Sequence, residues 1–225
     1  MEQVPFYAGL FFACTTMLSV WMFGRSAKHS RKVWLILLAW LTLQTVFGIS
    51  GFYTDPTGIP PRFAWLIAPP LLLIMGLFAT SKGRSFIDSL EVKPLVLLHT
   101  VRIPVELTLF WLFLYHAVPQ LMTFEGRNFD ILSGLTAPLV YYFGYHKKQL
   151  GRNLLLVWNF ICVGLLANIV FHAIFSAPFE FQRFAFEQPN IALLYFPFVW
   201  LPGVVVPLVL FSHLVAIRKL LRKSQ

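Results

Sequence analysis

Long runs of apolar residues, separated by short polar stretches, make up most of the chain. A helix that crosses the hydrocarbon core of a membrane needs about 20 mostly apolar residues, within a range of roughly 17–25. Six runs meet that length, and each is expected to form a membrane-spanning helix. They lie near residues 5–23, 33–50, 62–80, 95–118, 154–176 and 191–216.

A seventh apolar stretch, 130–145, is shorter and contains Pro138. The basic residues favour counting it as a span. With seven spans and the N-terminus outside, the inner loops hold 14 Lys and Arg residues and the outer loops hold 3, which is the bias expected of cytoplasmic loops. The sequence therefore predicts an all-α bundle of seven transmembrane helices over residues 1–225, forming a single domain with a cytoplasmic C-terminus.

Composition supports a membrane protein rather than a soluble one. The chain is 58% hydrophobic and only 12% charged, whereas soluble domains carry about 25% charged residues. The net charge of +9 comes from short loops rather than from one soluble face, so it indicates topology and a lipid bilayer as partner, not nucleic acid. We expect a bacterial inner membrane location and a retained first helix. The oligomeric state stays open.

The segment "HTVRIPVELTLFWLFLYH", residues 99–116, places charged residues inside a predicted span. His99, Arg102 and Glu106 follow i, i+3, i+7 spacing, so they share one helix face. Isolated charges at such depth cost about 2.5–3.5 kcal/mol each. We therefore expect Arg102 and Glu106 to neutralise each other on a face that points into the bundle. Pro104 removes the amide that would bond the carbonyl of Thr100, which predicts a kink beside the pair.

Two roles remain open for this face. It is either an ion pair that only holds helices together, or a site for a small anionic or protonatable ligand, as intramembrane ionisable residues often are. The last span places Ser212 and His213 near its inner end, where His213 can meet His99 across the bundle. Prolines around Gly203 predict a broken last helix that lines a cavity. The ligand-binding candidates are His99, Arg102, Glu106, Ser212 and His213.

Membrane enzymes are the rival class, and a structural or assembly subunit is a third possibility. His99, Glu106 and His213 are candidate ligands for a metal such as zinc, which would support a hydrolase. Pairing His99 and His213 with the outer His116 and His172 would instead give two bis-histidine haem sites of a redox protein. No catalytic residue and no cofactor follow from the sequence. Nucleotide-binding loops, nucleophile elbows and common zinc motifs are absent,.

Two outer loops supply secondary site candidates. The segment "FEGRNFD" contains Glu125, Arg127 and Asp130, and "EQPN" contains Glu187 and Asn190. Asp130 is the N-terminal residue of one predicted span and Asn190 precedes another, and their residue types favour capping the first turn of a helix. We therefore expect capping at these two positions.

Three segments resemble a family of uncharacterised bacterial seven-helix integral membrane proteins. They are "HTVRIPVEL", "FEGRNFDILSGLTAP" and "YFPFVWLPG". The likeness covers most of the chain and implies a membrane bundle. No activity is assigned to that family, so the resemblance implies no residue roles.

Overall fold

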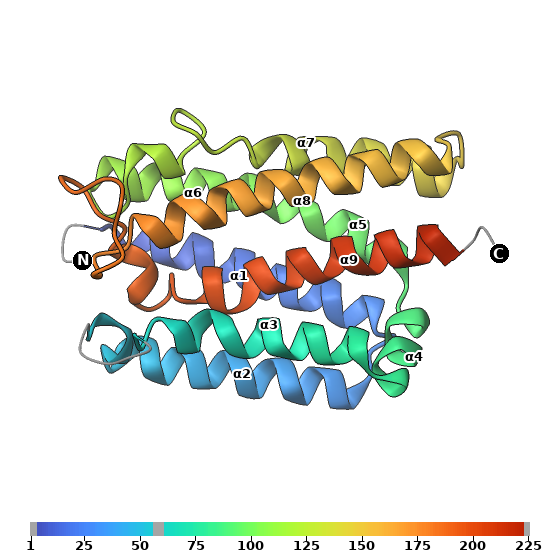
Figure 1. Cartoon of the computed structure of the whole chain (residues 1–225), viewed down its shortest axis with the longest axis horizontal. Coiled ribbons are helices and arrows are strands. Elements are labelled where there is room, and N and C mark those ends of the chain that lie inside the picture. Colours follow the sequence, from blue (N-terminus) through green and yellow to red (C-terminus); the bar gives the residue numbers. More distant parts are fainter. Residues whose placement is uncertain (1–3, 56–60, 223–225) are drawn as a thin grey trace.

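The computed structural model describes residues 4–55 and 61–222, and its helices run side by side along the long axis of the molecule (Figure 1). No strand occurs in these residues, so the predicted all-α class is confirmed. The α-helices are α1 (Phe6–Ser26), α2 (Arg31–Ile49), α3 (Ala64–Ala79), α4 (Ser81–Ser89), α5 (Val92–Leu98), α6 (Arg102–Leu114), α7 (Ile131–Leu139), α8 (Arg152–Phe175) and α9 (Val206–Arg222).

Short 3-10 and π-helical segments connect or extend these helices. Two of them continue a span: η2 joins α5 to α6, and η6 leads into α9. The 3-10 segments are η1 (Phe52–Thr54), η2 (His99–Val101), η3 (Gln120–Met122) and η5 (Ala192–Leu194). The π-helical segments are η4 (Val140–His146) and η6 (Leu201–Val205).

Five helical stretches of the described chain are long and apolar enough to cross a membrane. They are α1, α2, α5 to α6 as Val92–Leu114, α8, and η6 to α9 as Leu201–Arg222. A sixth is added if α3 and α4, which meet at an angle of 96°, form one broken span. By length and composition, these helices are compatible with a multi-pass membrane protein.

The weakest predicted span, 130–145, forms a short and uneven helix. Nine residues are α-helical in α7, and seven more form the π-helix η4. Pro138 lies inside α7 and has no amide hydrogen for the carbonyl four residues earlier. The backbone changes to the wider π-helix two residues after this proline. The combined segment, 131–146, is shorter than the five long spans.

The last helix begins later than predicted. It starts at Leu201 rather than at residue 191, and it continues to Arg222 rather than ending at 216. The preceding residues form η5 and turns, which include a cis peptide bond between Phe196 and Pro197. Pro197 and Pro202 cannot donate helix hydrogen bonds, which explains the late start. The predicted break around Gly203 is present as the π-helix η6.

Contacts with α4 hold the end of α9. Arg218 donates to both carboxylate oxygens of Asp88, at 3.0 and 3.2 Å, and Arg222 also pairs with Asp88. The ammonium group of Lys219 donates to the carbonyl of Leu90. The helix α4 lies across the end of the bundle where α9 finishes (Figure 1). These bonds stabilise the basic turns of α9 that a hydropathy pattern alone does not assign to the span.

Candidate functional site

The charged side chains that are buried in the described residues gather at one place. They are Arg102, Glu106 and Asp130, with 3%, 2% and 5% of their surface exposed. Two histidines and two asparagines, all buried, contact them directly or through one another. We call the whole group the polar cluster, and it consists of His99, Arg102, Glu106, Asn128, Asp130, Asn159 and His213.

A close helix contact brings α7 to the charged face of α6. Gly134 of α7 faces Ile103, and a Cβ atom at this glycine would lie 2.9 Å from Ile103 Cγ1 and 3.1 Å from Ile103 N. Only a residue without a side chain fits this approach. Because Asp130 is four residues earlier, at the start of α7, the contact delivers its carboxylate to Arg102. On the other helix, α6 is directly preceded by the 3-10 turn η2, which lies close to the kink predicted at Pro104.

Arg102 forms its ion pair with Asp130. The predicted pairing with Glu106 is therefore wrong, although both side chains are buried as expected. The i, i+4 spacing places the two on one face, but α7 supplies a carboxylate that reaches the guanidinium directly. The prediction for Asp130 is also corrected. It immediately precedes α7, yet its side chain makes no capping bond, because Arg102 uses it.

The neighbours of His213 determine its protonation. Its Nε2 lies 3.1 Å from Nη2 of Arg102, and an arginine can only donate. Nε2 therefore accepts, and the ring is neutral with its proton on Nδ1, which donates to Oδ1 of Asn159 at 2.8 Å. The ring of His99 stacks on that of His213, with 3.7 Å between centroids and 13° between planes. The expected meeting of these two histidines is thus present.

One carboxylate oxygen of Glu106 has a hydrogen-bond partner, and the other has none among the described residues. Its Oε1 accepts from the side-chain amide of Asn128 at 2.5 Å, while Oε2 is buried and has no hydrogen-bond partner among the described residues. Asn128 also donates to the carbonyl of Met122 at 3.0 Å and accepts from the backbone amide of Asp130 at 3.0 Å. The loop before α7 therefore holds the glutamate in place.

A small cavity of about 70 Å³ lies beside the cluster. Glu106, Asp130 and Asn190 contribute the polar groups of its wall, and the rest of the lining is apolar. Oδ1 of Asn190 is buried and, like Oε2 of Glu106, lacks a partner within the described ranges. A cavity of this size admits a few water molecules. It does not admit a drug-sized ligand, for which pockets of about 300–1,000 Å³ are typical.

The geometry does not fit the metal and haem hypotheses. In residues 4–55 and 61–222, no group of three or more His, Cys, Asp or Glu side chains is arranged to hold a metal ion. Both nitrogens of His213 already have partners, and rings stacked at 3.7 Å leave no space for an iron between them. Of the other two histidines in the haem hypothesis, His116 is exposed beside Gln188, and His172 bonds within its own helix to Asn168.

The other predicted site residues lie outside the cluster. Ser212 is buried, but its hydroxyl donates to Leu208 of its own helix at 2.7 Å. Glu125, Arg127 and Glu187 are exposed. Asn190 does not cap the last helix, which starts eleven residues later, at Leu201; its side chain instead donates to the carbonyl of Ala173 at 3.0 Å.

Sequence reasoning missed two members of the cluster, Asn128 and Asn159. Both are fully buried. Asn159 lies in the first half of a largely apolar span, and an amide in that position needs an internal partner. This signal was available in the sequence. Asn128 lies in a loop and carried no such signal, because a loop amide is ordinarily satisfied by water.

Comparison with known protein families gives a match that covers most of the chain. Residues 59–221 match the model of a family described as "Domain of unknown function (DUF8737)". The entire polar cluster lies within this range, whereas α1 and α2 precede it. Searches of the curated proteins and of the solved structures gave no match.

Proposed function

The chain belongs to the DUF8737 family, and we propose that it is an integral membrane protein that binds and transports protons, or a small protonatable solute, at Glu106. The observation that carries this proposal is the open oxygen Oε2 of Glu106, which is buried beside a cavity of about 70 Å³. No role of this kind comes from the family, whose description names no activity.

The charge balance of the polar cluster favours a proton or a cation over an anion. Two carboxylates, Glu106 and Asp130, are buried with one guanidinium, Arg102. Asp130 neutralises Arg102, and His213 is neutral because its Nε2 accepts from Arg102. An ionised Glu106 leaves the cluster one negative charge in excess, which is costly inside a membrane. Uptake of a proton removes that charge.

Besides Oε2 of Glu106, the polar cluster contains another buried atom without a hydrogen-bond partner within the described residues. Nδ1 of His99 is buried and has no hydrogen-bond partner in the described part of the chain. His99 lies seven residues before Glu106, about 10 Å along a helix axis. Between them, the guanidinium of Arg102 contacts the ring of His213, on which His99 stacks. Buried Glu and His side chains are the groups from which proton relays in membrane proteins are built.

In this proposal the protein lies in a bacterial inner membrane and crosses it seven times. The first turn of α1 and the last turn of α9 lie at opposite ends of the bundle, as an odd number of crossings requires (Figure 1). The 14-to-3 bias of basic residues supports a cytoplasmic location for the C-terminal end,. The segment 131–146 is the fifth of the seven crossings in chain order, and Pro138 lies inside it.

Reporter fusions test this topology. Alkaline phosphatase is active only outside the cytoplasm, so a fusion after Gln225 is expected to be inactive, and a fusion in the loop around Lys148 is expected to be inactive as well. A fusion in the loop around Arg127 is expected to be active. Activity at Gln225 or at Lys148 would contradict seven crossings in this orientation.

Proton flux through vesicles tests the role of Glu106. The purified protein is reconstituted in vesicles that contain a pH-sensitive dye, and a pH step is applied outside. We expect wild type to dissipate the step, and Glu106→Gln to reduce the rate at least about ten-fold, because the amide can accept from Asn128 but cannot bind a proton. Glu125→Gln is the matched control, since this carboxylate is exposed, and its flux should equal that of wild type.

An infrared measurement separates proton binding from transport. A protonated carboxyl group has its own C=O stretching band, which Glu106→Gln should remove and Glu125→Gln should leave. Flux equal to that of empty vesicles would contradict transport, and absence of the band in wild type across neutral pH would contradict proton binding. If the cluster only holds helices together, wild type and Glu106→Gln should both show the flux of empty vesicles.

A further inference from the structure

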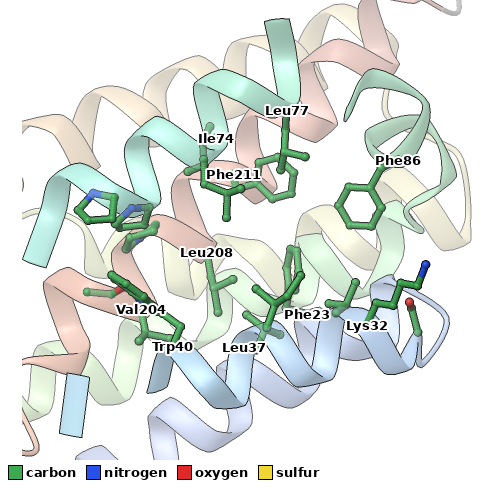
Figure 2. A pocket seen from close by; sticks show the side chains of 18 residues that line it. Phe23, Lys32, Leu37, Trp40, Ile74, Leu77, Phe86, Val204, Leu208 and Phe211 are labelled. Carbon is green, nitrogen blue, oxygen red and sulfur yellow. The ribbon is translucent and has the colours of Figure 1, made fainter. Parts of the chain in front are cut away.

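A long apolar groove of about 540 Å³ lies between α2, α3 and the start of α9 (Figure 2). Its two walls are α2 and α3, and its floor is η6 with the start of α9. Phe23 of α1 and Phe86 of α4 contribute at one end. This volume is within the range of about 300–1,000 Å³ that is usual for ligand sites.

The three helices line the groove with the same spacing. Each contributes residues i, i+1, i+4, i+5 and i+8, which form one continuous face of a helix,. The faces run from Lys32 to Trp40 on α2, from Pro69 to Leu77 on α3, and from Gly203 to Phe211 on η6 and α9. The groove is therefore a straight channel parallel to the helices, rather than a local packing defect.

The groove is apolar along its length and polar at one end. Ser30 and Lys32 lie at the end where α2 begins, and Figure 2 shows Lys32 at the same end of the groove as Phe86. At the opposite end, the indole of Trp40 donates to the carbonyl of Gly203 at 2.8 Å, so its polar atom is satisfied. A ligand that fits this pattern has an apolar tail and an anionic head.

The length of the groove matches one leaflet of a membrane. Lys32 and Trp40 are eight residues apart, which is about 12 Å along a helix, whereas half of a hydrocarbon core is about 15 Å. The α2 wall faces outward. Only 17% of its most apolar stretch is buried, whereas 67% is buried in the span that forms the floor. Ile36 and Leu73, which lie on opposite walls, remain 60% and 55% exposed.

We propose that this groove binds one acyl chain of an anionic phospholipid from the cytoplasmic leaflet, with the phosphate of its headgroup paired to Lys32. The inference rests on the membrane location and orientation in the proposed function, but not on proton binding at Glu106. Charge complementarity selects this occupant, because Lys32, in the first turn of α2, puts a positive charge at one end of the groove, and basic residues next to a span attract anionic headgroups.

Lipid retention tests the proposal. The protein is reconstituted in vesicles with equal amounts of phosphatidylglycerol and phosphatidylcholine of the same acyl chains, and the lipids that stay bound are counted by native mass spectrometry. We expect one phosphatidylglycerol to be retained preferentially. Lys32→Gln should lower that preference about five-fold, as expected for one basic side chain at an anionic surface. Arg31→Gln is the matched control, since Arg31 is adjacent but does not line the groove.

Filling the groove tests the acyl chain separately from the headgroup. Ile36→Trp and Leu73→Trp each place a larger side chain in the groove, from opposite walls. Both positions can accommodate an indole without disturbing the fold, because the native side chains are more than half exposed. Each should abolish retention of the lipid without changing the proton flux. Equal retention of the two lipids, an equal loss in Arg31→Gln, or a dimer that Ile36→Trp converts to monomers would each overturn the proposal. The last outcome would show that a second copy of the chain occupies the groove.

Discussion

Arg102→Met and Asp130→Asn are each expected to lower the free energy of unfolding by about 3–5 kcal/mol, because each leaves an uncompensated partner in a buried site. Arg102 and Asp130 are 3% and 5% exposed and form an ion pair between α6 and the start of α7. The double variant should recover most of the loss, since neither desolvation penalty then remains. The measurement is unfolding by denaturing detergent in mixed micelles.

The pair between Arg62 and Asp55 is the matched control. Its atoms are 2.8 Å apart, but the side chains are 40% and 30% exposed. Exposed pairs contribute about 1 kcal/mol or less, so Arg62→Gln should change the unfolding free energy by no more than that. Single variants of Arg102 and Asp130 that are both as stable as wild type would show that no buried pair exists. A double variant that is as unstable as the sum of the singles would contradict mutual neutralisation.

Gly126→Ala is expected to destabilise the protein by about 2 kcal/mol or more, as overpacking against a fixed backbone does. A Cβ atom at Gly126 would collide with the carbonyl of Gln120 and would lie 2.6 Å from Cα of Leu121. These are backbone atoms, which cannot turn aside as a side chain can. The loop must open, and Asn128, two residues later, then moves away from Glu106.

Two measurements check the effect of this glycine. Unfolding in mixed micelles gives the stability, and the infrared band of the protonated carboxyl group should shift in frequency, because Glu106 loses its amide donor. Gly164→Ala is the control, since nothing lies within 4 Å of a Cβ atom at that position, and alanine is the better helix former. If Gly126→Ala is as stable as Gly164→Ala, the loop before α7 is not packed as described.

Hydropathy alone located most of the helices. The runs near 5–23, 33–50, 95–118 and 154–176 correspond within four residues at each end to Phe6–Ser26, Arg31–Ile49, Val92–Leu114 and Arg152–Phe175. The reason is physical, since the thickness of the hydrocarbon core determines how long an apolar helix must be. The last span was misplaced because an aromatic, proline-containing approach is as apolar as a helix but cannot form its hydrogen bonds.

The sequence also singled out His99, Arg102, Glu106 and His213, because charged and polar groups inside an apolar span are too costly to be incidental. Which of them bind each other was decided only in three dimensions. Arg102 pairs with Asp130 instead of Glu106 because Gly134 lets α7 approach Ile103 at contact distance. Helix spacing predicts which side chains share a face, but a partner across the bundle depends on how closely two helices approach, and that depends on packing between residues far apart in the chain.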